Sequence, residues 1–202
     1  MNPSFTAEFS TAFRRFPVFN LMGLVPAYLA AYFVYRGVDI NPPLMAGAGV
    51  YFVFLSSVIG QVYSHRGYAR PDKAAKDSSY SWLIRHLAGS VGPICLACAG
   101  TEAVLLARTN QPWLVTLTLS ASFFAACLAF GAWGLVGDRK RAVDQIGLAL
   151  PLALLVLLPK ADRILKAPVM HPFICALILL ALSALIWLWC ARRVTSLGAR
   201  TR

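Results

Sequence analysis

Apolar residues fall into long blocks along this chain, separated by short polar segments. A helix needs about 20 apolar residues to cross the ~30 Å hydrocarbon core of a membrane. The blocks predict about six transmembrane helices, over residues 18–35, 43–63, 87–107, 113–136, 143–158 and 173–191. The connecting segments are too short for a second domain. We therefore predict an all-α, polytopic membrane protein whose residues 1–202 form one transmembrane domain in contact with membrane lipid.

The N-terminal segment has the pattern of an amphipathic helix that lies in the membrane interface. Four phenylalanines recur at spacings that place them on one helical face, namely Phe5, Phe9, Phe13 and Phe16. Ser4 can cap the start of this helix, Pro17 marks its end, and Arg14 and Arg15 lie beside the aromatic stripe. We predict an interfacial helix over about residues 4–16.

The longest polar segment, residues 64–86, follows the second span and is rich in Lys and Arg. Near its end, the segment 78–87 alternates polar and large apolar residues in the manner of a short amphipathic helix at the membrane surface. Its candidate contact residues for a cytoplasmic partner are Tyr80, Trp82, Leu83 and Arg85. This is the best candidate docking surface in the sequence.

The charged residues indicate an orientation and narrow the choice of partner. Only 13% of the residues are charged, about half the share in an ordinary soluble domain. With the N-terminus inside, 14 of the 19 Lys and Arg residues fall on segments predicted to be cytoplasmic. The other five are Arg36, Arg108, Lys160, Arg163 and Lys166. We expect both termini in the cytoplasm. The net charge of +11 then indicates contact with anionic lipid, and we expect no nucleic-acid partner.

Patterns for catalysis or metal binding are weak. Cys95 and Cys98 have the spacing of a redox pair or half a zinc site, but they lie in an apolar span without a second such pair, so helix packing is their expected role. No segment has the glycine-rich loop that binds nucleotide phosphates, and residues 89–92 lack the Gly-x-Ser-x-Gly pattern of serine hydrolases. We expect neither enzyme activity nor a cofactor or metal.

Glu102 is the one acidic residue deep inside a predicted span, and Thr101 lies beside it. A charge at that depth is costly unless it is neutralised by protonation, paired, or exposed to water. Two interpretations remain open. Glu102 and Thr101 could contact a substrate or a proton on a translocation path, or Glu102 could form a structural ion pair with Arg108 near the outer surface.

The order of these features resembles the type 2 ABC exporter permeases. On this resemblance the N-terminal helix is the connecting helix and the segment 78–87 is the coupling helix, and together they grip a separately encoded cytoplasmic ATPase. The resemblance also implies a second membrane subunit, either an identical or a different chain, and a location in the bacterial inner membrane. The expected function is that of a permease subunit of an ATP-driven exporter that moves an amphipathic cargo by alternating access.

Two other functions also fit about six spans with cytoplasmic ends. One is a substrate-capture subunit of an energy-coupling-factor importer, in which small residues of the first span such as Ala27 and Ala31 would contact a shared coupling subunit. The other is a membrane protein that does not transport, either an assembly or immunity factor or a lipid-modifying enzyme without a recognisable motif. An accompanying ATPase would favour the exporter, and a vitamin-sized pocket open to the outside would favour the importer.

Overall fold

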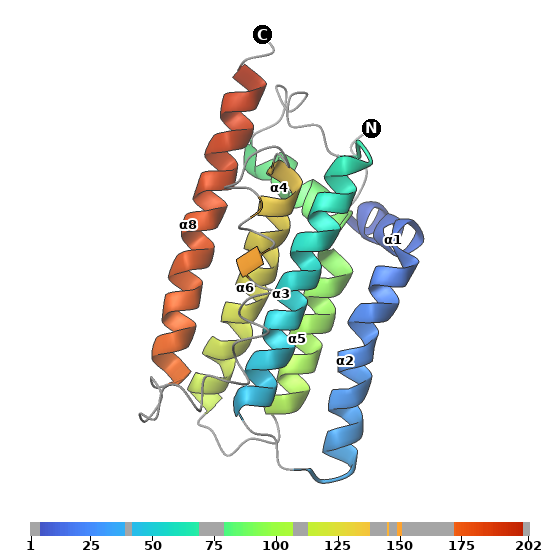
Figure 1. The fold of residues 1–202 in the computed structure, drawn as a ribbon, viewed down its shortest axis with the longest axis vertical. Coiled ribbons are helices and arrows are strands. Elements are labelled where there is room, and N and C mark those ends of the chain that lie inside the picture. Colours follow the sequence, from blue (N-terminus) through green and yellow to red (C-terminus); the bar gives the residue numbers. More distant parts are fainter. Residues whose placement is uncertain are drawn as a thin grey trace.

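The computed structural model of this protein describes residues 5–38, 42–68, 79–106, 113–137, 145, 149–150 and 172–199. None of the described residues lies in a β-strand. The helices with defined bounds are α1 Phe5–Arg15, α2 Pro17–Tyr35, α3 Pro42–His65, α4 Ser79–Ala88, α5 Gly92–Leu106, α6 Trp113–Val136 and α8 Pro172–Ala199 (Figure 1).

Within these ranges, four helices are long and apolar enough to cross a membrane. They are α2, α3, α6 and α8, and the bent pair α4 and α5 is a fifth if its halves form one span. The prediction of a helical protein with several helices that could cross a membrane is thereby confirmed for the described residues. The predicted span 143–158 falls largely outside the described residues, so the count of six stays a prediction.

Three predicted spans agree closely with the helices found. The span 113–136 coincides with α6, and the span 43–63 matches α3 to within two residues at each end. Helix α2 begins one residue before the predicted first span, with Pro17 at its first position. Proline fits there because the first amide of a helix has no intrahelical acceptor to lose.

The helix that contains the last predicted span, 173–191, does not stop at residue 191 as predicted. Helix α8 continues through Arg192 and Arg193 and ends at Ala199. Arginine is a good helix former, and its long side chain can reach water from the surface of a helix. The two arginines therefore mark a change of environment along α8 and do not end it.

The third predicted span, 87–107, is wrong at its start because the chain bends there. Helix α4 ends at Ala88, α5 begins at Gly92, and their axes differ by 74°. Pro93 at the second position of α5 explains the break, since proline is tolerated in the first turn of a helix but disrupts a continuous one. Helix α5 consequently has 15 residues and lies across the direction of α4.

Helices α3 and α6 pack against each other at the centre of the bundle, with α5 on one side and α8 against α6 (Figure 1). Glycines allow the two central backbones to approach closely. A Cβ added at Gly134 would lie 2.5 Å from the carbonyl oxygen of Ser57, and one added at Gly60 would overlap the carbonyl oxygen of Gly131. Small residues at such crossings are typical of helices that associate within a membrane.

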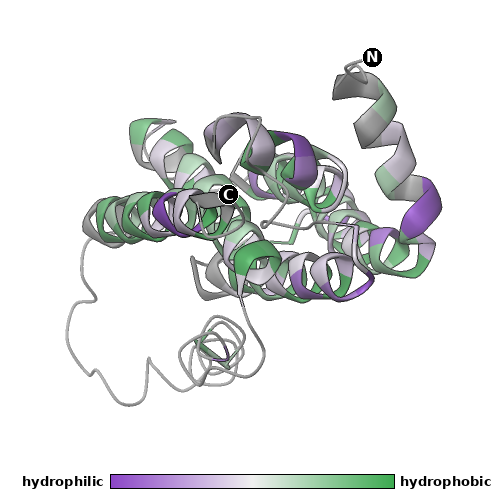
Figure 2. Ribbon diagram, turned by 90° about the horizontal axis from the view of Figure 1, so that it is seen from above, coloured by the Kyte–Doolittle hydropathy of each residue, from purple (hydrophilic) through white to green (hydrophobic). Residues whose placement is uncertain are grey.

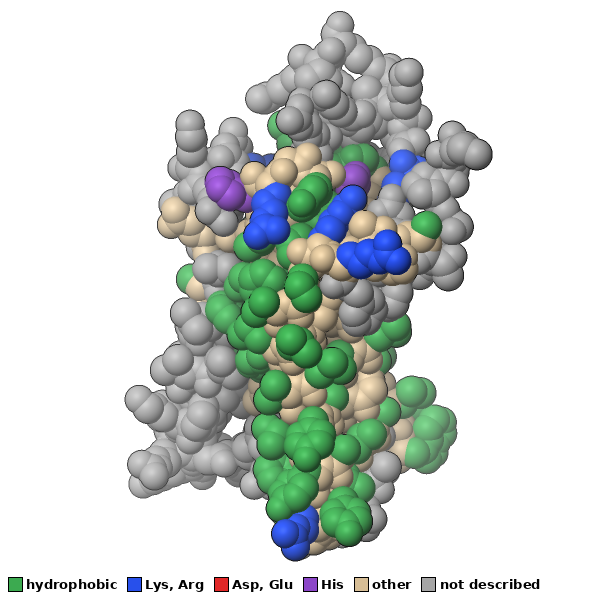
Figure 3. All heavy atoms as spheres, turned by 90° about the vertical axis from the view of Figure 1, so that its right-hand side faces the viewer, with side chains coloured by type: hydrophobic (Ala, Val, Ile, Leu, Met, Phe, Trp, Pro, Cys, Tyr) green, Lys and Arg blue, Asp and Glu red, His purple; other side chains and the backbone are tan. Residues whose placement is uncertain are grey.

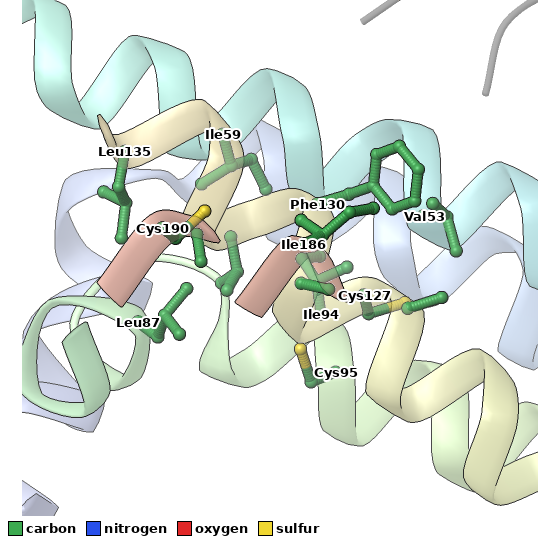
Figure 4. Close-up of a cluster of buried hydrophobic side chains, with 14 of the residues drawn as sticks. Val53, Ile59, Leu87, Ile94, Cys95, Cys127, Phe130, Leu135, Ile186 and Cys190 are labelled. Carbon is green, nitrogen blue, oxygen red and sulfur yellow. The ribbon is translucent and has the colours of Figure 1, made fainter. Parts of the chain in front are cut away.

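The core contains apolar side chains from five of the described helices, α3, α4, α5, α6 and α8, and Figure 4 shows part of it. Its labelled members are Val53, Ile59, Leu87, Ile94, Cys95, Cys127, Phe130, Leu135, Ile186 and Cys190. The outer surface is also apolar along its length, as Figure 3 shows for one face. An apolar exterior around an apolar core is what a lipid solvent requires.

Helix α2 lies at the edge of the bundle and packs mainly against α5. Gly23 faces the bundle, where an added Cβ would lie 2.5 Å from the Cδ1 atom of Ile94. The opposite face of α2 carries exposed large residues, including Leu21 and Tyr28, which is 73% exposed. Its row of small residues therefore serves packing within this chain, at least at Gly23.

Candidate functional site

Helices α1 and α4 lie together at one end of the bundle, which is also the end reached by the C-terminal part of α8 (Figure 1). We call this the junction end, and the opposite end the far end. Helix α1 contacts α2, α4 and α5, while α4 contacts α5, α6 and α8. Seen along the bundle, α1 projects from its side (Figure 2). The two segments that the sequence predicted to lie at a membrane surface are thus neighbours.

A cluster of aromatic and basic side chains connects α1, α3 and α4. We call it the aromatic junction, and its members are Arg15, Phe16, Tyr63, Tyr68, Trp82 and His86. Arg15 donates a hydrogen bond of 3.2 Å to the Tyr63 hydroxyl and lies 4.7 Å from the ring centre of Tyr68. The Tyr63 hydroxyl is also 3.4 Å from Nδ1 of His86, which packs on Trp82. These contacts make the three helix ends one packed unit.

Phe16 differs from its predicted role. The predicted interfacial helix reached residue 16, but α1 ends at Arg15 and Phe16 lies at the break before α2. Its side chain is buried in the aromatic junction, with its ring centre 5.9 Å from that of Tyr63. Phe16 therefore holds α1 to the bundle. The side chains of Phe5, Phe9 and Phe13 lie outside those that the structure describes.

The predicted docking residues of α4 divide between its two faces. Trp82 is 4% exposed and Leu83 is fully buried, so both belong to the core. Tyr80 is 48% exposed and Arg85 is half-buried. Ile84, which the sequence analysis did not single out, is 52% exposed and lies one turn beyond Tyr80 on the same side of α4. A partner could therefore contact Tyr80, Ile84 and the edge at Arg85.

The junction end is basic in the part of the chain that the structure describes. Arg14, Arg66 and Arg192 are exposed there, and Arg193 is partly exposed. Basic and histidine side chains collect at this end of the face drawn in Figure 3, while hydrophobic side chains cover the length below. Among the acidic residues of the chain, Glu102 is the one whose side chain is described.

Glu102 lies in α5, fully buried, toward the far end of the bundle. Both of its carboxyl oxygens lack a hydrogen-bond partner among the described atoms, and so does the hydroxyl of the adjacent Thr101. Arg108, the candidate ion-pair partner from the sequence, lies outside the described residues. The carboxyl group thus lies in the core beside apolar side chains and thiols.

A row of polar groups extends from Glu102 through the core. The thiol of Cys127 on α6 interacts with the thiols of Cys95 and Cys98 on α5. Glu102, one turn beyond Cys98, lies near enough to Cys127 for an electrostatic interaction. Ser56 on α3 lies close to the thiols of Cys95 and Cys127. Sequence reasoning missed Ser56 and Cys127, although a hydroxyl or thiol inside an apolar span is a signal for such contacts.

Four cysteine side chains are described in this structure. Cys95, Cys98, Cys127 and Cys190 are free and buried, which agrees with the expected packing role of the first two. Among the described residues, no three or more His, Cys, Asp and Glu side chains are arranged to hold a metal ion. Buried free cysteine behaves as a small apolar residue.

Comparison of this chain with protein-family models, with curated proteins and with solved structures finds no match. Two features of the described chain bear on its function. One is the junction end with its transverse helix α4, and the other is the buried polar row that contains Glu102.

Proposed function

We propose that this chain is the permease subunit of a multi-component membrane transporter, an ATP-driven exporter whose ATPase is a separate chain. The observation that supports this most is the 74° bend between α4 and α5. It turns α4 across the direction of the long helices at the end where α1 also lies. A transverse helix beside an N-terminal surface helix is the arrangement expected of a coupling helix and a connecting helix.

In this proposal the junction end faces the cytoplasm, α1 lies in the membrane interface, and a sixth span completes the domain. The exposed arginines of the junction end favour this orientation, since Lys and Arg are retained on the cytoplasmic side and meet anionic headgroups there. Membrane lipid covers the apolar length of the helices. The location follows as a bacterial inner membrane with both termini inside.

The proposed mechanism transmits movement of the ATPase through α4. Trp82 and Leu83 fix α4 in the core, and α4 contacts α5, α6 and α8. A displacement of α4 by a bound partner would therefore move α5, α6 and α8 together at the junction end. Tyr80 and Ile84 offer the partner an apolar contact, and Arg85 offers it a charge.

A second membrane subunit belongs to this proposal because exporters of this kind pair two permeases around the cargo path. The exposed outer face of α2 is one surface that a second subunit could cover. Glu102 and Thr101 face the interior of this chain's own helices, so a path that reached them would have to open between α5 and α6.

The test is purification of the affinity-tagged full-length chain from its native host in a mild detergent. We expect an ATPase subunit to co-purify and ATP hydrolysis to be measurable in the complex. Replacing Ile84 by Arg should remove the ATPase, because a charge would be added to the apolar contact. Leu185→Ala, which alters an exposed residue of α8 away from the outer face of α2, should leave it bound.

Other results would contradict the exporter proposal in different ways. A shared coupling subunit and a bound vitamin-sized molecule would indicate an energy-coupling-factor importer. A pure monomer, obtained under conditions that retain known transporter complexes, would indicate a membrane protein without a transport function.

A further inference from the structure

The buried carboxyl group of Glu102 raises a question that the docking of an ATPase does not answer. An ionised carboxylate in an apolar interior is strongly unfavourable, and in proteins such a group is paired with a cation or takes up a proton. Glu102 is fully buried in α5, and no hydrogen-bond donor among the described atoms reaches either of its oxygens.

The cationic side chains that the structure describes are all engaged elsewhere or distant. Arg36, the one described arginine at the far end, is exposed and donates a hydrogen bond of 3.1 Å to the Tyr32 hydroxyl. The arginines and His86 of the junction end lie near the start of α5, about 15 Å of helix away from Glu102. Protonation is then the way in which the described part of the chain can neutralise this carboxyl group.

The titratable groups nearest to Glu102 are thiols. Cys98 precedes it by one turn on α5, and Cys127 approaches from α6. Tyr51 on α3 uses its hydroxyl to donate to the carbonyl of Met22, at 3.2 Å. The tyrosines of α2 with described side chains are exposed on its outer face. None of these groups supplies a positive charge.

Hydroxyl groups at the same depth complete a site that a protonated carboxyl group could use. Helices α5 and α6 are antiparallel and meet at Cys95 and Cys127. Glu102 follows Cys95 by seven residues, and Ser120 precedes Cys127 by seven residues, so each lies about two turns toward the far end on the same face of its helix. The two residues are therefore expected at about the same level of the bundle. The hydroxyls of Ser120 and Thr101 both lack a partner among the described atoms.

Other hydroxyls in these helices are satisfied by their own backbone. Thr118 donates to the Leu114 carbonyl at 2.7 Å, Ser122 to that of Leu119 at 2.7 Å, and Ser183 to that of Leu179 at 2.7 Å. The free hydroxyls near Glu102 therefore stand out from the usual behaviour of Ser and Thr in a helix. They offer both a donor and an acceptor to a neighbouring group.

We propose that Glu102 is a reversible proton-binding site in the bundle, and that its carboxyl group, once protonated, turns to form hydrogen bonds with the unpartnered hydroxyls of Thr101 and Ser120, which it does not reach in this structure. The ligand is a proton, which the carboxylate takes from water and returns to water. Exchange requires α5 and α6 to separate toward the far end, where α5 ends one turn beyond Glu102. Proton occupancy then reports and stabilises the closed packing of these two helices. This inference goes beyond the proposed function and does not depend on an ATPase.

The test is infrared spectroscopy of the full-length protein in lipid nanodiscs, as a difference between the natural chain and Glu102→Gln. We expect the carbonyl-stretch band of a protonated carboxylic acid at neutral pH, its absence in the variant, and its conversion to carboxylate bands in alkaline solution. Carboxylate bands of Glu102 at neutral pH would overturn the proposal and support an ion pair such as that with Arg108.

A second variant tests the hydrogen-bond partner and does not alter the carboxyl group. Ser120→Ala should move the acid band to higher frequency, because the carboxyl group loses a partner. Ser122→Ala is the matched control, since the Ser122 hydroxyl donates to its own helix, and it should leave the band in place. A band unaffected by both variants would remove Ser120 from the site. Glu102→Gln should retain any co-purifying ATPase, so failure here is distinguishable from failure of the exporter proposal.

Discussion

At the scale of single residues, glycine sets how closely the two central helices approach. Gly60 of α3 faces the carbonyl of Gly131, and Gly134 of α6 faces the carbonyl of Ser57. Lipid supplies no hydrophobic force between helices, so their association depends on close van der Waals contact. Each glycine at this crossing therefore stabilises the bundle by allowing the two backbones to come into close contact.

We predict that Gly60→Ala lowers the thermal midpoint of the protein in detergent, because the added methyl group overlaps backbone atoms. The expected loss in the free energy of unfolding is about 1–3 kcal/mol. Gly100→Ala is the matched control, since an added Cβ at that position in α5 meets nothing within 4 Å. The thermal midpoint of that variant should equal or exceed that of the natural protein, because alanine has a higher helix propensity than glycine. Equal midpoints for both variants would mean that α3 and α6 do not approach this closely.

At the scale of elements, the bend between α4 and α5 and the aromatic junction belong together. The bend turns α4 toward α1, and the buried Tyr63 at the end of α3 then meets groups from both helices. Arg15 contributes a charge-assisted hydrogen bond, which is stronger than a neutral one. The ends of three helices consequently depend on one tyrosine hydroxyl.

We expect Tyr63→Phe to loosen α1 while leaving the bundle folded. The lost hydrogen bond is worth about 1 kcal/mol or somewhat more. Amide hydrogen exchange measured by mass spectrometry should become faster in α1 and stay unchanged in α6. Tyr51→Phe is the control, because the Tyr51 hydroxyl donates to the carbonyl of Met22 on α2 and has no part in the junction. Unchanged protection of α1 in Tyr63→Phe would show that Arg15 and Tyr63 do not hold it.

At the scale of the whole molecule, polar and apolar surfaces are separated along the bundle. The described arginines collect at the junction end, with Arg36 at the other, and apolar side chains cover the length between. This distribution suits a protein whose middle faces lipid and whose ends face water and headgroups. The N- and C-terminal parts of the chain reach the same end of the bundle in Figure 1.

Reporter fusions test this layout in cells. Green fluorescent protein fused after Arg202 or before Met1 should fluoresce, because both ends are predicted to lie in the cytoplasm. Alkaline phosphatase inserted at residue 110 should be active, because the loop between α5 and α6 is predicted to lie outside. Activity of the phosphatase at the C-terminus would contradict the predicted topology, and together with fluorescence of the N-terminal fusion it would require an odd number of spans.

Much of the helix layout could be predicted, and the reasons for the errors are physical. Hydropathy located α3 and α6 because a lipid solvent demands uninterrupted apolar helices of membrane-spanning length. It predicted the short helix 78–87 to within one residue of α4 at each end, but it began the next span at residue 87, five residues before α5, because apolar residues continue there; Gly89, Gly92 and Pro93 mark the break. It also ended α8 too early at Arg192 and Arg193, since hydropathy reports environment and not where a helix stops.

The candidate site was predicted less completely. Glu102 and Thr101 were found from the sequence because polar residues are rare in apolar spans. The proximity of Glu102 to Cys127 was not predicted, because Cys127 lies in another helix and becomes a neighbour through its packing against α5. The docking surface of α4 was found as a segment, but its burial pattern assigned Trp82 and Leu83 to the core and added Ile84 to the exposed face.

The sequence alone determined that the helices are apolar enough to lie in lipid, that the protein is helical, and roughly where most of its long helices lie. Each of these properties is set by local composition along the chain. The tertiary structure decided which polar groups meet. It buried Phe16 and Tyr63 between helices, brought α1 beside α4, and enclosed Glu102 beside Cys127. Those outcomes depend on helix crossings and on the bend before α5, which join residues far apart in sequence and leave no periodic signal in it.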